Sequence, residues 1–88
     1  MNCVIIDDDK FSTRIIEDFI GRTEGLNLVG SYSSAVEAIN KMSRPDAERV
    51  NIIFLDIEMP EMSGIEFLKS LSELPQVIIY SSQEKYAL

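Results

Sequence analysis

The side chains in this sequence best suited to chemistry are oxygen donors that stand directly after short apolar runs. There are three such places: Asp7–Asp8–Asp9 after Cys3–Ile6, Asp56 after Ile52–Leu55, and Ser81–Ser82 after Val77–Tyr80. Parallel strands bring their carboxyl ends to one edge of a sheet, where α/β proteins bind ligands. If the runs before Asp7 and Asp56 are neighbouring strands, Asp7, Asp8 and Asp56 converge there, with a serine hydroxyl nearby.

Three clustered carboxylates repel one another, so some of them hold protons unless a cation is present. Hard oxygen ligands select Mg²⁺, Mn²⁺ or Ca²⁺ rather than zinc or copper. Mg²⁺ typically takes one or two carboxylates and leaves positions for phosphate oxygens. A carboxylate is also a nucleophile that can form an acyl phosphate. The residues therefore predict a divalent-cation site and phosphoryl transfer onto one aspartate.

Each of these residues taken alone has a simpler structural interpretation, because Asp and Ser favour turns and helix caps. Asp9 is expected only to cap the following helix. Cys3 is expected in the core, and Tyr80 is expected to pack within the sheet. The constellation at three strand ends favours a site more than any single residue does.

Apolar runs alternate with amphipathic stretches along the chain, and this order predicts the fold class. The expected strands are Cys3–Ile6, Leu26–Gly30 or on to Tyr32, Ile52–Leu55 and Val77–Tyr80. The expected helices run from Lys10 to about Arg22, from the Ser34-x-x-Glu37 capping box to before Pro45, from the Ser63-x-x-Glu66 capping box, and from Gln83. Strands apolar on both faces that alternate with helices predict an α/β fold with a doubly wound parallel sheet.

The composition narrows the function classes further. The 88 residues carry 15 acidic and 8 basic side chains, a formal charge of −7, which disfavours direct nucleic-acid binding and suits a cation or a basic partner. The absence of histidine excludes imidazole catalysis and histidine zinc sites within these residues. A single cysteine, no apolar run of ~20 residues and no signal-like start lead us to expect a cytoplasmic protein without a membrane span.

Three stretches together resemble the receiver domain of two-component response regulators. They are Val4–Asp9, Phe54–Gly64 with its LDIEMPEMSG motif, and Ile79–Ser82. The spacing of 25 residues from Asp56 to Ser81 and the ending Gln83–Leu88 look most like receivers of LytTR-type regulators, in which a DNA-binding domain follows. The resemblance covers the whole chain and implies a flavodoxin-like receiver fold with the strand order 2-1-3-4.

The resemblance also implies roles for individual residues. Asp56 is the phosphoacceptor, Asp8 binds Mg²⁺ directly, and Asp7 acts mainly through a coordinated water. The backbone carbonyl of Glu58 supplies another metal oxygen, and the hydroxyl of Ser81 contacts the phosphoryl group. The implied partners are a sensor histidine kinase as phosphodonor and an output domain, with Mn²⁺ as an alternative to Mg²⁺.

The sequence departs from the family pattern at its end. Residues 1–88 are expected to form an incomplete receiver domain, because the fifth strand, the fifth helix and the lysine that normally pairs with the phosphate have no counterpart before Leu88. Slow or undetectable phosphorylation is therefore expected. An exposed edge at Val77–Tyr80 and an uncovered apolar side of the first helix, around Ile15, Ile16 and Phe19, predict self-association. The expected routes are the strand edge, the helix side or an exchange of the C-terminal segment between chains, and the alternative is a marginal monomer that partly unfolds or aggregates.

Two other functions stay open. One is an interaction module that binds a divalent cation structurally and never receives phosphate. The other is a hydrolase of the aspartyl-phosphate type, which typically has a second aspartate two residues after the first, where this sequence has Glu58. In the receiver interpretation the chain is no enzyme beyond its own phosphorylation and dephosphorylation.

Overall fold

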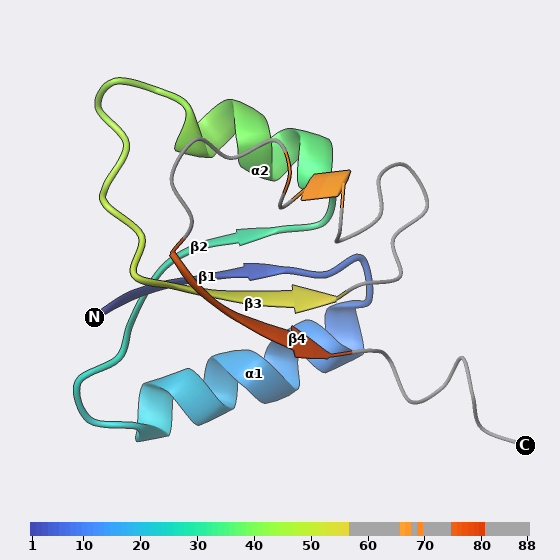
Figure 1. Ribbon diagram of the computed structural model, residues 1–88. Helices are drawn as coiled ribbons and strands as arrows, with labels where there is room; N and C mark the ends of the chain where they lie inside the picture. The colour runs from blue at the N-terminus through green and yellow to red at the C-terminus, as the bar shows by residue number, and fades with distance from the viewer. Residues whose placement is uncertain (57–65, 68, 70–74, 81–88) are drawn as a thin grey trace, which may run out of the picture.

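The computed structural model describes residues 1–56, 66, 67, 69 and 75–80, and in them it contains four strands and two helices (Figure 1). The elements are β1 (Asn2–Ile6), α1 (Lys10–Arg22), β2 (Asn27–Tyr32), α2 (Ala35–Met42), β3 (Ile52–Asp56) and β4 (Gln76–Tyr80). Glu66, Phe67 and Lys69 are helical, within the helix expected from Ser63. The start of that helix and the helix expected from Gln83 lie outside the described residues.

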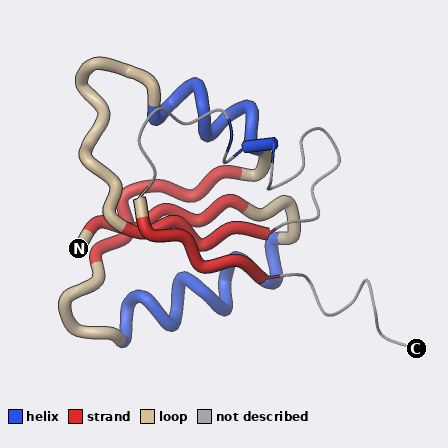
Figure 2. The backbone as a smooth tube through the Cα atoms, in the orientation of Figure 1, coloured by secondary structure: helices blue, strands red, loops and turns tan. Residues whose placement is uncertain are grey.

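The four strands form one parallel sheet in the order β2-β1-β3-β4. Helix α1 covers one face of the sheet and α2 lies over the other (Figures 1 and 2). The expected α/β architecture and the strand order 2-1-3-4 are therefore confirmed. Because β1 and β3 are neighbours, the residues that follow them lie next to each other.

The alternation of side chains along each strand divides the core into two halves. On the α2 side the buried residues include Val4, Ile6 and Phe67, the last of which is fully buried. On the α1 side they include Cys3 and Ile5. Cys3 is thus a core residue, as expected. Strands that are apolar on both faces require helices on both faces, which is why this sequence builds a three-layer fold.

The helix ends follow the sequence signals in most details. Asp9 caps α1 by accepting hydrogen bonds from the backbone N–H groups of Phe11 and Ser12, as expected. Ser34 caps α2 by accepting from the N–H of Glu37, but the Glu37 carboxylate accepts from Ser33 Oγ at 3.4 Å, so the capping box is only half formed. Gly25 has a φ of 90°, a conformation that glycine adopts at little cost, and it lies in the turn between α1 and β2.

A group of asparagines links three strands at the opposite end of the sheet from the acidic residues. Asn51 Oδ1 accepts from the backbone N–H of Asn2 at 2.7 Å, and Asn2 Nδ2 donates to the carbonyl of Arg49 at 2.9 Å. Asn27 Nδ2 donates to Asn2 Oδ1 at 3.3 Å. These bonds satisfy backbone groups where the strand ladders begin.

Replacing Asn51 with Ala is expected to lower the free energy of unfolding by about 1–2 kcal/mol, because it leaves the partly buried N–H of Asn2 without its acceptor. Urea denaturation measures the change. Asn40→Ala, at an exposed position of α2, is the matched control and is expected to cause no loss, since alanine is the better helix former. Equal effects of the two substitutions would contradict the role given to Asn51.

Large apolar side chains along one side of α1 and on β4 are exposed. Phe11, Ile15 and Phe19 are 65%, 57% and 55% exposed, and the Phe19 ring makes an edge-to-face contact with Phe54, with ring centroids 6.3 Å apart. Ile78 of β4 pairs with Phe54 in register and is 44% exposed. We call Phe11, Ile15, Phe19 and Ile78 the outer apolar face. The expectation for Ile16 was wrong, because this residue is half-buried and packs against the α1-side core. Within the described ranges, no helix combines the length and apolarity needed to cross a membrane.

Candidate functional site

The candidate site lies at the carboxyl ends of β1, β3 and β4. Asp7 follows β1 directly, and its N–H donates to the carbonyl of Tyr32 at 3.0 Å, which extends the pairing of β1 with β2. Asp56 is the last residue of β3 and Tyr80 the last residue of β4, and the two are paired in register. Asp8 begins the turn into α1. The sheet therefore positions these residues through its backbone ladder.

The three aspartates predicted to converge do so. Asp7, Asp8 and Asp56 each offer a carboxylate oxygen, and these oxygens all lie within 4.8 Å of one another. We call these three residues the acidic cluster. Asp7 and Asp56 are buried, with 3% and 0% of their surface exposed, whereas Asp8 is exposed. One open and two buried hard oxygen donors fit a small divalent cation that enters from the Asp8 side.

The Asp7 carboxylate is held by a donor on each oxygen. The backbone N–H of Asp9 donates to Oδ1 at 2.8 Å, and the Tyr80 hydroxyl donates to Oδ2 at 2.7 Å. Burial raises the pKa of Asp7 above its usual value, these two hydrogen bonds oppose the rise, and the charge of Asp56 adds to it. The raised pKa of Asp7 means that burial, and to a smaller extent the Asp56 charge, disfavours its anionic form, and a bound cation would favour that form.

Tyr80 is the residue whose part in the site the sequence did not indicate. Its ring packs against the α1-side core, so the expectation of sheet packing holds, but its hydroxyl also reaches the acidic cluster. Burial and the Asp7 carboxylate raise the pKa of Tyr80, so the phenol stays protonated and acts as a donor. The sequence indicated only that a tyrosine ends the strand Val77–Tyr80, as Asp56 ends the neighbouring strand, and the register of the sheet places the two on the same face.

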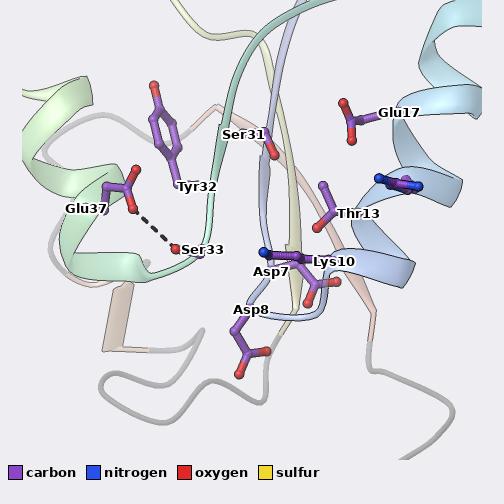
Figure 3. Close-up of a pocket in the computed structure, with 10 residues that line it drawn as sticks. Asp7, Asp8, Lys10, Thr13, Glu17, Ser31, Tyr32, Ser33 and Glu37 are labelled. Atoms are coloured by element: carbon purple, nitrogen blue, oxygen red, sulfur yellow. Dashed lines mark hydrogen bonds between the residues drawn. The ribbon is translucent and has the colours of Figure 1, made fainter.

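A pocket of about 270 Å³ opens beside the cluster, between the start of α1 and the start of α2. Figure 3 shows the Asp7 and Asp8 side chains at its edge and the Ser33–Glu37 hydrogen bond on the α2 side. The other lining residues are Lys10, Thr13, Arg14, Glu17, Ser31 and Tyr32. The Asp8 side of the cluster thus faces a recess lined by side chains of both charges.

Two of the predicted site residues, Glu58 and Ser81, lie outside the described residues. The structure therefore gives positions for Asp7, Asp8 and Asp56 alone among the five residues expected at the site. Asp9 lies close by but caps α1, as expected.

Comparisons with known proteins agree with this arrangement. A family model described as the response regulator receiver domain matches residues 3–88. An uncharacterized response regulatory protein of Vibrio cholerae is 30% identical over 100% of this chain and 37% of its own length. The transcriptional regulatory protein BtsR of Escherichia coli is 30% identical over 97% of this chain and 35% of its own length. This chain thus spans little more than a third of these curated relatives.

A solved structure gives the same result in three dimensions. The response regulator domain of Thermotoga maritima CheB matches with a TM-score of 0.76 and 31% identity, over 93% of this chain and 60% of that one. The strand order, the acidic residues at the strand ends and the family match together lead to one conclusion: this chain belongs to the receiver domain family of two-component response regulators.

Proposed function

We propose that this chain is a phosphoacceptor receiver, which takes a phosphoryl group onto Asp56 from a sensor histidine kinase with the help of Mg²⁺. The observation that carries the proposal is the acidic cluster, in which a fully buried aspartate at the end of β3 lies within 4.8 Å of two more carboxylates. A receiver that works this way acts in the cytoplasm. We propose further that residues 1–88 belong to a single receiver domain.

In the proposed reaction, a carboxylate oxygen of Asp56 forms a bond to phosphorus while the bond from phosphorus to the donor nitrogen of the kinase histidine breaks. The electron pair of that broken bond returns to the imidazole. Asp8, Asp56 and Asp7 would hold the Mg²⁺, Asp7 mainly through water, together with the backbone carbonyl of Glu58. When bound, Mg²⁺ or Mn²⁺ supplies positive charge that balances the phosphoryl oxygens. The Ser81 hydroxyl would donate to one of those oxygens.

The test is phosphoryl uptake by the 88-residue chain from acetyl phosphate, over long incubation and with mapping of the labelled residue. We expect slow labelling that is confined to Asp56, requires Mg²⁺ and does not occur when EDTA is present during the incubation. Labelling at Asp56 would exclude the other candidate, a non-phosphorylated interaction module with a structural cation site. Labelling that is insensitive to EDTA would count against both.

The proposed readout is a change in an output domain of the LytTR type, which binds DNA. The Asp56-to-Ser81 spacing and the Gln83–Leu88 ending support this assignment, and the E. coli relative is named a transcriptional regulatory protein. With a formal charge of −7, residues 1–88 are not assigned any DNA contact of their own.

We also propose that the chain associates with a second copy through the outer apolar face. This face combines three exposed side chains of α1 with Ile78 on β4, the last strand of the sheet among the described residues, and apolar surface at a sheet edge favours pairing with another chain.

Light scattering at micromolar concentration is expected to show a mass above that of the monomer. Ile15→Lys is expected to lower the apparent mass, because it places a charge within the apolar contact. Asn40→Lys adds the same charge at an exposed position of α2 and is expected to leave the apparent mass unchanged. A monomeric wild-type chain, or equal behaviour of the two variants, would contradict association through this face.

A further inference from the structure

The side chain of Tyr80 spans a neighbouring strand to reach the acidic cluster. Strand β3 lies between β1 and β4, and Tyr80 at the end of β4 is paired with Asp56 at the end of β3. Its hydroxyl nevertheless bonds Asp7, which follows β1 and is 73 residues away in the sequence. The ring must therefore cross the carboxyl end of β3 at Asp56, on the α1 side of the sheet.

This contact gives the Asp7 carboxylate a hydrogen-bond donor on its second oxygen, so that both oxygens are held in place. One oxygen accepts from the Asp9 backbone at 2.8 Å and the other from Tyr80 at 2.7 Å, so the two donors come from opposite sides of the cluster. Each carboxylate oxygen has two lone-pair positions, so a single donor leaves room for a cation or its bound water. The two bonds set the direction of the remaining lone pairs.

We propose that Tyr80 is a positioning residue for the divalent cation, which it serves by orienting the Asp7 carboxylate. This inference rests on the proposed function, because that function places a cation at the acidic cluster. Hydrogen-bond partners behind metal ligands hold those ligands in the binding orientation, and their removal typically costs about 10–100-fold in metal affinity. Asp8 is exposed and has no such bond to a described residue, so of these two proposed ligands it is Asp7 whose orientation is fixed.

The experiment measures Mn²⁺ affinity of the full 88-residue chain by electron paramagnetic resonance of free Mn²⁺. Tyr80→Phe keeps the ring and removes the hydroxyl, and we expect about tenfold weaker binding. Thr23→Val is the control: it likewise removes one hydroxyl, which donates to the Phe19 carbonyl at the end of α1 far from the acidic cluster, so we expect wild-type affinity. Thermal unfolding of each variant in EDTA checks that both are folded at the temperature of the titration.

A double-mutant cycle with Asp7→Asn separates positioning from a general effect on the fold. If Tyr80 acts through Asp7, Tyr80→Phe changes Mn²⁺ affinity in the wild-type background and has no further effect in the Asp7→Asn background. Unchanged or tighter Mn²⁺ binding by Tyr80→Phe would overturn the inference and leave the proposed function standing, as would an effect that persists without Asp7. A wild-type chain that binds no Mn²⁺ would overturn both.

Discussion

Asp56→Asn is expected to abolish phosphoryl uptake from acetyl phosphate. Asp56 is fully buried at the end of β3 and is one of the three carboxylates of the acidic cluster. A cation bound by this cluster would lie next to the incoming phosphoryl group. An amide lacks the anionic oxygen that attacks phosphorus, so no acyl phosphate can form at this position. Asparagine has nearly the same shape as aspartate, and the substitution removes one charge from a repulsive cluster, so the variant is expected to fold.

Radiolabel uptake and mapping of the labelled residue measure this prediction. Asp46→Asn removes the same charge from an exposed position beyond α2, at the other end of the sheet, and is expected to label like wild type. Persistent labelling of Asp56→Asn would assign the acceptor role to another residue. Loss of label in both variants would point to overall charge rather than to this side chain.

Asp7→Asn is expected to stabilise the metal-free chain at neutral pH by about 1–3 kcal/mol. Two nearby unit charges at an effective dielectric of 20 repel by up to about 4 kcal/mol at 4 Å, and part of this is already offset by hydrogen bonds. Asparagine can still accept from the Asp9 N–H, and its amide can donate toward Tyr80 or Asp56, so the local bonds survive. Urea denaturation in EDTA measures the change.

The pH dependence of this effect has a definite sign. The pKa of Asp7 is raised in the folded state above its unfolded value of 3.8, so the folded chain binds this proton more tightly. The associated stability is fully present below pH 3.8 and is lost as the pH rises through the folded-state pKa. The difference between Asp7→Asn and wild type should therefore be small near pH 4 and reach its full size at neutral pH. A difference that is constant with pH would contradict this assignment, and saturating Mg²⁺ should shrink it by stabilising the wild type.

The sequence predicted the sheet well because short β-branched runs ended by acids carry the strand signal directly. The strand at Ile52–Leu55 extends by only one residue, to Asp56. The convergence of Asp7 and Asp56 followed from strand ends alone, since parallel neighbours present their carboxyl ends together. These features depend on where the strands begin and end, and the pattern of apolar and polar residues along the sequence indicates those positions directly.

The features that the sequence did not predict depend on side-chain reach and helix rotation. Whether the Tyr80 hydroxyl stays in the core or crosses β3 to Asp7 depends on its rotamer and on the strand order, which no local pattern contains. Ile16 and Ile15 are both apolar and adjacent, yet only Ile16 packs against the core, because the rotation of α1 on the sheet decides which side is covered. Which of these two isoleucines is buried therefore depends on the sheet surface against which α1 packs.

The hydrogen bond between Asp7 and Tyr80 has a consequence for how the chain folds. It joins residues 73 positions apart and involves the two strands on either side of β3, so the site exists only when β1, β3 and β4 have all docked. Closing so long a loop is entropically costly and comes late in a folding process dominated by local contacts. An ion bound there would therefore stabilise the fully folded chain relative to states in which these strands have not yet docked. In hydrogen exchange it should slow the amides of these three strands together, as one cooperative unit.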